Sequence, residues 1–265
     1  MYSSFQLAYK YLNYYLTASN GKGHGIHSPF VFDFITKVLN DKKTYPAYRR
    51  VEELREKLLL DNNVLNVEDF GAGSSVTKSN QRRIASIAKN AAKPKKFGKL
   101  LFRMVQYYKP EQVLELGTSL GITTSYLASA NPNARVSTFE GSKEIAESAA
   151  KNFQSLELNN IKLITGNFDE TLAPAINQLS SVEFAFIDGN HRYKPTINYF
   201  NHILSKTHSN SVLIFDDIHW SKEMEQAWEE IKNHSAITST IDLFFIGLVF
   251  FRSEIKEKQH FTIRF

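Results

Sequence analysis

The amino-acid sequence predicts an α/β protein with a seven-stranded, mostly parallel sheet, an antiparallel strand pair near the C-terminus and an N-terminal helical region. Two observations lead to this fold class. From residue 100 onward, short apolar runs rich in β-branched residues alternate with helical stretches about every 20–30 residues, which is typical of βαβ units. Before residue 60, apolar residues recur at three- and four-residue spacing, which indicates amphipathic helices.

The N-terminal region should be helical. We expect helices over residues 5–16, 30–39 and 49–60. Pro29 favours the start of the second helix, because proline fits the first helical position. The glycine-rich loop before it contains His24 and His27. These histidines could touch a substrate, although a loop histidine more often forms local hydrogen bonds only.

The remaining chain supplies the strands. We expect parallel strands in QVLELG, RVSTFE, IKLITG, VEFAFIDG and SVLIFDD. STIDLFFIG and LVFFR are separated only by a glycine-centred turn, so they should pair antiparallel, and HFTIRF alternates like an edge strand. We therefore divide the chain into a helical region, 1–98, and an α/β domain, 99–265.

Composition and charge exclude several classes of function. The chain has no cysteine, which excludes disulfides, thiolate nucleophiles and zinc–sulfur sites. It shows no signal-peptide pattern, and its longest apolar run, LFFIGLVFF, is too short to span a bilayer. We expect a soluble cytoplasmic protein that has no membrane partner.

The positive charge is concentrated in the first 100 residues, which carry 17 Lys and Arg against 8 Asp and Glu. The rest of the chain carries 15 against 19. A basic half can bind nucleic acid. Here, however, most basic residues are interspersed with acids in helical segments, so we favour a solvated surface over a nucleic-acid partner.

Two glycine-containing stretches could form a nucleotide-binding loop, VEDFGAGSSV (67–76) and VLELGTSLGITTSYLASA (113–130). Such a loop needs a buried strand before it, a helix directly after it and an acidic residue at the end of the next strand. The first stretch is followed by polar residues and by no strand that ends in an acid. We expect it to be a loop, which could still cover an active site.

The second stretch meets all three requirements. QVLEL is the strand, Gly117 and Gly121 shape the turn, and ITTSYLASA begins the helix. Glu140 ends the next strand, 23 residues beyond Gly117, where a carboxylate can accept hydrogen bonds from ribose hydroxyls. The pattern acid-x-Gly-x-x-x-Gly lacks the third glycine of a dinucleotide site. Glu115 beside the turn suits an ammonium and a sulfonium better than a phosphate.

This order of features resembles the class I S-adenosylmethionine-dependent methyltransferases over about residues 99–250, and implies a Rossmann-like fold. "LITGNFDE" stands where that family brings a strand end against the adenine, and "FAFIDGNH" stands where an acid closes the site. The resemblance implies that S-adenosylmethionine is the cofactor. The cofactor-binding residues that it implies are Glu115, Gly117, Thr118, Ser119, Gly121, Thr123, Glu140, Asn167, Phe168 and Asp188.

A second resemblance concerns the acceptor. Enzymes that methylate base amino groups typically carry Asp/Asn-Pro-Pro-aromatic where this chain has Asp188-Gly-Asn-His191. With "VLIFDDIHW", this looks like the catechol and caffeoyl-coenzyme-A O-methyltransferases and their bacterial relatives. That resemblance implies a divalent cation, Mg²⁺ or Mn²⁺, bound by Asp188, Asp216 and Asp217. His191 or His219 could add a nitrogen ligand.

The catalytic base is less clear, because this chain departs from that family. The family's catalytic lysine lies three residues after the first acid, and His191 occupies that position here. A phenol is mostly protonated at neutral pH and must lose its proton to react. A bound metal would lower the pKa of the phenol, and His191 would accept the proton. Lys194, three residues further on, is the alternative base.

The function that these resemblances imply is methyl transfer to a small phenolic or catechol-like hydroxyl. Residues 1–98 would form the acceptor wall, with Arg82, Arg83 and Lys99 as candidate contacts. The alternatives are a metal-independent small-molecule methyltransferase, a nucleic-acid methyltransferase, an NAD-dependent oxidoreductase and a non-catalytic S-adenosylmethionine-binding protein. A homodimer is left open.

Overall fold

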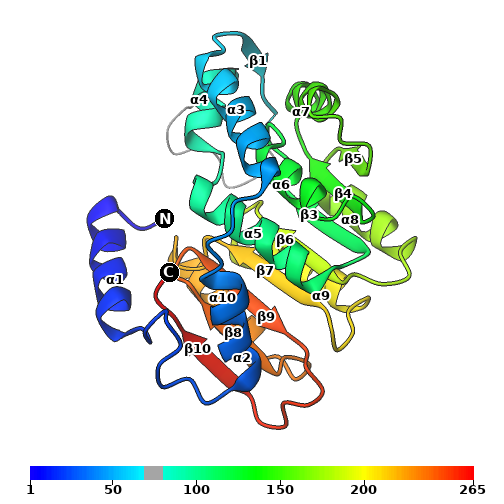
Figure 1. The fold of residues 1–265 in the computed structure, drawn as a ribbon. Helices are drawn as coiled ribbons and strands as arrows, with labels where there is room; N and C mark the ends of the chain where they lie inside the picture. The colour runs from blue at the N-terminus through cyan, green and yellow to red at the C-terminus, as the bar shows by residue number, and fades with distance from the viewer. Residues whose placement is uncertain (69–79) are drawn as a thin grey trace. The chain divides into compact units, whose positions relative to one another are not determined.

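The structure is a computed structural model that describes residues 1–68 and 80–265. It forms two compact units (Figure 1). One unit contains residues 1–41 together with 178–265, and the other contains residues 42–177. The stretch VEDFGAGSSV lies mostly outside the described residues, since only its first two positions are included.

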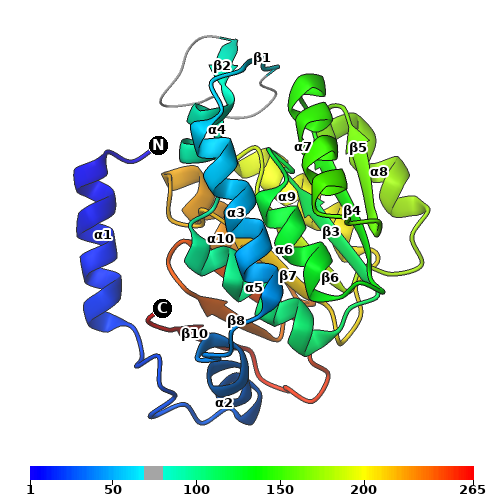
Figure 2. The same ribbon diagram turned by 45° about the horizontal axis from the view of Figure 1, so that its top comes forward.

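The unit 42–177 has a three-stranded parallel sheet in the order β3-β4-β5 and a separate antiparallel pair, β1–β2. Figure 2 shows α6 and α7 running alongside β3 to β5. The elements of this unit are α3 (Pro46–Leu60), β1 (Val64–Asn66), β2 (Gln81–Arg83), α4 (Ile84–Asn90), α5 (Lys95–Tyr108), β3 (Gln112–Leu116), α6 (Ile122–Ala130), β4 (Arg135–Glu140), α7 (Lys143–Ser155), β5 (Ile161–Thr165) and α8 (Phe168–Asn177).

The other unit has five strands in the order β10-β8-β9-β7-β6. β6 and β7 are parallel, β9 is antiparallel to both β7 and β8, and β10 is parallel to β8. The elements of this unit are α1 (Ser4–Thr17), α2 (Pro29–Phe34), η1 (Ile35–Leu39, a π-helical turn), β6 (Phe184–Ile187), α9 (Tyr193–Leu204), β7 (Val212–Asp216), α10 (Lys222–Asn233), β8 (Ser239–Asp242), β9 (Ile246–Phe250) and β10 (Gln259–Thr262).

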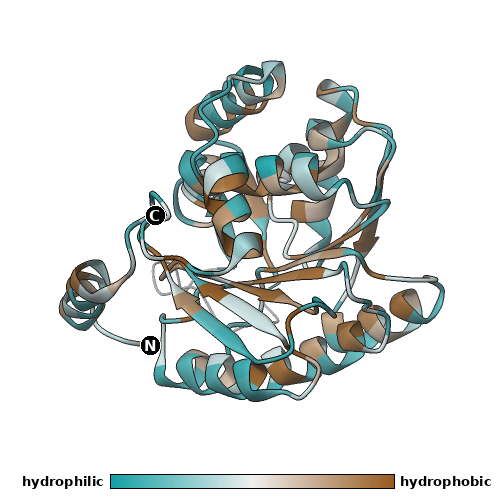
Figure 3. Ribbon diagram, turned by 60° about the horizontal axis from the view of Figure 1, so that its bottom comes forward, coloured by the Kyte–Doolittle hydropathy of each residue, from teal (hydrophilic) through white to brown (hydrophobic). Residues whose placement is uncertain are grey.

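The central strands are apolar because both of their faces are covered. Every residue of β6, β7 and β9 is buried. Figure 3 shows brown, hydrophobic stretches in the sheet and helices in which teal and brown residues alternate. A strand buried on two faces reads as a continuous apolar run. Gly247 in β9 leaves room for the Trp228 ring of α10, since an added Cβ would lie 2.6 Å from that ring.

The predicted α/β, Rossmann-like fold is confirmed, with corrections in detail. The five expected parallel strands are present as β3 to β7, and β8 and β9 form the expected antiparallel pair. The described strands β3 to β10 number eight instead of seven, because β10 adds to the edge beside β8. The β1–β2 pair was not predicted, because it joins short, mostly exposed segments without an apolar pattern.

The helices of the N-terminal region also follow the prediction. α1, α2 with η1, and α3 lie where apolar periodicity placed helices, and Pro29 is the first residue of α2. Within residues 1–68 and 80–265, no helix is long and apolar enough to cross a membrane. The functional division into residues 1–98 and 99–265 stays a prediction.

Candidate functional site

The predicted site residues fall into two groups, one in each compact unit. Residues 115–168 form a cofactor group at the carboxyl ends of β3, β4 and β5. Asp188, His191, Lys194, Asp216 and Asp217 form an acceptor group at the carboxyl ends of β6 and β7.

The turn between β3 and α6 requires unusual backbone conformations. Gly117, Ser119 and Gly121 all have positive φ, at 98°, 48° and 80°. An added Cβ at Gly121 would lie 2.4 Å from the ring of Phe153 in α7. Glycine is therefore required here both by the dihedral angle and by the space available.

The start of the turn is fixed to strand β4. The backbone N–H groups of Gly117 and Thr118 both donate to the carbonyl of Phe139, each at 3.0 Å. The hydroxyl of Thr118 lies 2.6 Å from that of Thr138. These bonds fix the start of the turn to the end of β4.

Glu115 lies inside the protein and does not face an open surface. Its side chain is fully buried, with 0% exposure. Its Oε2 accepts hydrogen bonds from the hydroxyls of Thr124 and Thr138. The carboxylate thus connects β3, β4 and α6, and its predicted part in shaping the methionine pocket would be exerted through that bracing.

Glu140 connects the cofactor turn to helix α7. Its Oε2 accepts from the backbone N–H of Ser119 at 2.8 Å, and its Oε1 accepts from that of Ser142 at 3.0 Å. An ionised carboxylate can accept about four hydrogen bonds. Glu140 therefore holds the turn at the end of β4, and its binding of a ribose stays a prediction.

The other predicted cofactor residues lie around the same strand ends. Thr123 is buried in the first turn of α6. Asn167 follows β5, and its side-chain oxygen accepts from the N–H of Asp169 at 3.1 Å, which caps α8. Phe168 is half-buried and lies edge-on to Phe139, with ring centroids 6.5 Å apart.

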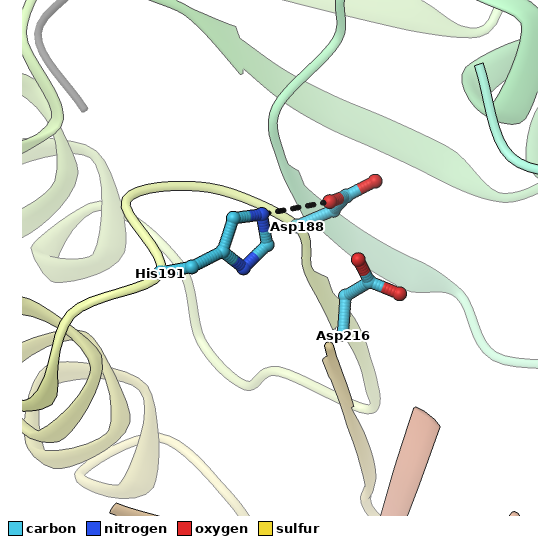
Figure 4. Close-up of side chains that lie close together, drawn as sticks. All are labelled: Asp188, His191 and Asp216. Carbon is cyan, nitrogen blue, oxygen red and sulfur yellow. Dashed lines mark ion pairs between the residues drawn. The ribbon is translucent and has the colours of Figure 1, made fainter. Parts of the chain in front are cut away.

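The acceptor group begins with two carboxylates on neighbouring parallel strands. Ile187 of β6 pairs with Phe215 of β7, so Asp188 and Asp216, the next residues of the two strands, emerge side by side. Asp216 is buried, whereas Asp188 is half-buried. Figure 4 shows the two side chains close together, with the ring of His191 directed toward Asp188.

His191 is placed by the turn after β6. Asn190 has a φ of 51°, and its side chain donates to the Tyr199 hydroxyl at 3.2 Å and accepts from Arg192 at 2.9 Å. The Nε2 of His191 then lies 3.5 Å from Asp188 Oδ1 and 4.0 Å from Asp217 Oδ2.

Asp188, His191 and Asp216 can each offer one ligand atom, and these three atoms all lie within 4.8 Å of one another. Two carboxylates and an imidazole at this separation fit a divalent cation. The structure thus brings together two of the three predicted carboxylates with His191. The third predicted carboxylate, Asp217, has a φ of 53° and lies near this cluster only on the side of His191.

His219 does not supply a metal ligand. Its Nδ1 bonds to Glu225 at 3.1 Å and its Nε2 to Asp242 at 2.8 Å, so both ring nitrogens are already used. Burial by itself lowers the pKa of His219, but the bonds to Asp242 and Glu225 outweigh it and raise the pKa. Glu225 also binds Lys10 and the Tyr2 hydroxyl, so this network fixes α1 to α10.

The contacts described here assign no role to the remaining candidates. Lys194 is exposed in the first turn of α9. Arg82 and Arg83 belong to β2, His24 and His27 lie between α1 and α2, and Lys99 in α5 places its ammonium 4.8 Å from the Tyr48 ring centroid. Their functions stay predictions.

Trp220 is a site residue that sequence reasoning missed. Its ring centroid lies 5.7 Å from that of His191. Its carbonyl also accepts from the backbone N–H of Tyr2 at 3.0 Å, which ties the chain's first residues to the loop after β7. The signal was available in "VLIFDDIHW", where an indole follows the two acids closely.

Part of this chain matches a known protein family and a curated protein. Residues 114–218, from β3 to the loop after β7, match a family model described as a methyltransferase domain. An uncharacterized protein of Acanthamoeba polyphaga mimivirus is 32% identical over 69 residues, which are 24% of this chain. The match spans about a third of the length of that curated relative, 31%.

Two solved structures illustrate the likeness in fold. One is an O-methyltransferase of Streptomyces achromogenes involved in tomaymycin synthesis, in complex with S-adenosylmethionine; it is 17% identical, with a TM-score of 0.56, over 80% of this chain and 92% of its own. The other, a Staphylococcus aureus protein assigned as a caffeoyl-coenzyme-A O-methyltransferase, is 16% identical, with a TM-score of 0.55, over 76% and 91%.

The fit of Gly121 against Phe153 gives a first prediction. Gly121→Ala should lower the free energy of unfolding by about 1–3 kcal/mol, because the new methyl group clashes with a buried ring at a positive φ. Gly25→Ala is the matched control, since Gly25 has a similar φ of 79° but open space around its Cβ position. Equal losses in urea denaturation for the two variants would show that the clash with Phe153 carries no energy.

The bonds of Glu140 give a second prediction. Glu140→Ala should weaken binding of S-adenosylhomocysteine by about tenfold or more, because the ribose loses a charged acceptor and Ser119 loses its partner. Calorimetric titration measures this affinity. Glu147→Ala, which removes an exposed carboxylate of α7, is the control and should bind like the wild type. Unchanged affinity in a folded Glu140→Ala protein would remove Glu140 from the cofactor site.

Proposed function

We propose that this chain, an S-adenosylmethionine-dependent methyltransferase in its fold and its matched domain, transfers the cofactor's methyl group to a hydroxyl oxygen of a small phenolic or catechol-like molecule with the help of a divalent cation. The observation that carries the acceptor and metal part is the cluster of Asp188, His191 and Asp216. The methyltransferase part rests on the domain match over residues 114–218 and on the glycine turn.

The cofactor group suits S-adenosylmethionine better than a dinucleotide. Two glycines shape the turn, and Glu140 at the end of β4 would accept from the ribose. A pyrophosphate would add negative charge to a region that already contains Glu115 and Glu140. A sulfonium and an ammonium carry positive charge instead, so those carboxylates attract them.

Methyl transfer is an in-line displacement in which the acceptor oxygen must approach the methyl carbon to about 3 Å. In the proposed reaction, Asp188 and Asp216 would hold a divalent cation, and that cation would lower the pKa of the acceptor hydroxyl. His191 accepts the hydroxyl proton on Nε2, and Asp188 and Asp217 stabilise the resulting imidazolium. Trp220 lies beside His191 and offers an apolar surface to an aromatic acceptor.

Two features bear on the alternative acceptors. Several basic residues of the first 100 positions are engaged within the protein: Arg55 and Lys95 contact Glu52, and Lys99 lies over Tyr48. This favours a small acceptor over a nucleic acid. Residues 1–98 remain the proposed acceptor wall, in which α1 is held by the bonds of Tyr2 and Lys10 to Glu225. A homodimer stays a prediction.

The metal gives a third prediction. Excess EDTA should abolish methylation of catechol substrates, and Mg²⁺ or Mn²⁺ should restore it. Asp188→Asn and Asp216→Asn should each reduce kcat by about a hundredfold or more while S-adenosylhomocysteine still binds, because they lose a charged ligand but leave the cofactor turn intact. Full turnover in chelator would mean that the acids act without a metal.

The role of His191 gives a fourth prediction. If His191 is the base, His191→Ala should lower kcat at saturating metal, added imidazole should restore part of the rate, and Mg²⁺ should support activity as well as Mn²⁺ does. If His191 is instead a ligand, the variant should require far more metal and the wild type should prefer Mn²⁺, because imidazole suits transition metals. Lys194→Met is the control and should retain activity; its inactivity would make Lys194 the base.

A further inference from the structure

The antiparallel pair β1–β2 belongs to the proposed acceptor wall, but its bonds to helix α7 have not yet been given a role. Asn66 pairs with Gln81 at the end of β1, and the N–H of Val67 donates to the carbonyl of Asn80 at 2.6 Å. These bonds give Asn66 and Val67 a defined position at the end of the paired strands. We call residues 64–68 and 80–83 the hairpin stem.

The hairpin stem contacts the first turn of α7 through two separate connections. Asn66 donates its backbone N–H to Glu144 Oε2 at 2.6 Å and its side-chain amide to Glu144 Oε1 at 2.8 Å. Both oxygens of one carboxylate therefore bind one asparagine. The N–H of Glu68 points toward the hydroxyl of Ser142 at 3.4 Å, which makes the second connection.

Ser142 is unusual for a residue at the start of a helix. It occupies the N-cap position of α7, yet its side chain accepts no hydrogen bond from its own helix. A serine at this position normally caps the N2 or N3 amide. Ser142 instead offers its hydroxyl to the hairpin stem, and it is completely buried, with 0% exposure.

Ser142 also connects this contact to the cofactor turn. Its backbone N–H donates to Glu140 Oε1, and Glu140 Oε2 in turn accepts from Ser119. The hydroxyl and the N–H of one residue therefore join Glu68 on one side to the ribose acceptor on the other. α7 supports the same turn further along, because Asn152 donates to the Leu120 carbonyl at 2.9 Å.

We infer that Asn66, Glu144 and Ser142 are positioning residues for Glu140, so that the hairpin stem contributes to recognition of the cofactor's ribose hydroxyls. This inference rests on the proposed function, since it assigns a ribose to Glu140. The geometry acts on α7: Asn66 fixes the first turn of that helix through Glu144, and the fixed turn aims the Ser142 N–H at Glu140. The same bonds lower the pKa of Glu144 and keep it an ionised acceptor.

If the contact between the hairpin stem and α7 served only stability, the variants would change cofactor affinities in a different pattern. A general loosening of α7 would weaken binding of every cofactor analogue by the same factor. A loss of aim at Glu140 would matter only for analogues that carry the hydroxyl which Glu140 receives. The ratio of affinities for ribose and deoxyribose forms therefore separates the two roles, as in a double-mutant cycle.

The test uses the full chain with S-adenosylhomocysteine and its 2′-deoxy and 3′-deoxy analogues in calorimetric titrations. Asn66→Ala and Ser142→Ala should each weaken S-adenosylhomocysteine binding by about threefold to tenfold. For at least one deoxy analogue, the loss should fall to less than about twofold. At saturating cofactor, kcat should stay near the wild-type value. Glu144→Gln keeps one acceptor oxygen and should recover part of the affinity that Glu144→Ala loses.

Asn62→Ala is the matched control, because Asn62 is an exposed asparagine just before the hairpin stem and its side chain, among residues 1–68 and 80–265, bonds only to the carbonyl of Leu60. It should bind all three ligands like the wild type. Equal losses for all three ligands in the Asn66 and Ser142 variants, or no loss at all, would overturn the inference. Failure of the wild type to bind S-adenosylhomocysteine would instead refute the proposed function. Thermal unfolding verifies that each variant is folded, and Ser142→Ala carries the test if Asn66→Ala is not.

Discussion

The turn between β3 and α6 is the constraint on which the cofactor group depends. Three of its residues, Gly117, Ser119 and Gly121, adopt positive φ, a conformation that costs free energy for any residue with a side chain. Such a turn persists only where its surroundings hold it. Here the Phe139 carbonyl, the Glu140 carboxylate and helix α7 each bind part of it. The strained backbone in return places the turn and the Glu140 carboxylate together at the carboxyl ends of the strands.

The acceptor group is also built from the ends of parallel strands and from turns with positive φ. Asp188 and Asp216 meet because parallel strands in register end together. Asn190 and Asp217 then take positive φ without being glycine, as their short polar side chains allow. These two turns bring His191 close to Asp188 and Asp217 close to His191. Carboxylates held this close repel one another unless a proton or a cation lies between them, which is why the cluster suits chemistry that moves a proton beside a metal.

Much of this arrangement could be predicted, because it depends on local patterns. The periodic apolar runs gave the strands, and the end of each parallel strand gave Glu140, Asp188 and Asp216. Contacts between distant segments could not be predicted in this way. The bond from Asn66 to Glu144 joins residues 78 positions apart, and neither has a distinctive neighbourhood in the sequence. His219 looked like a possible ligand because it follows two acids, but Asp242 and Glu225, which occupy its nitrogens, come from other elements.

The central claim is that the turn after β3 binds S-adenosylmethionine and not a dinucleotide. The most direct measurement compares S-adenosylhomocysteine and NAD in calorimetric titrations of the full chain. We expect S-adenosylhomocysteine to bind with one molecule per chain and to raise the thermal unfolding temperature, since a ligand at about 100 times its Kd adds about 2.7 kcal/mol of stability. NAD at the same concentration should do neither. Binding of NAD without binding of S-adenosylhomocysteine would contradict the account.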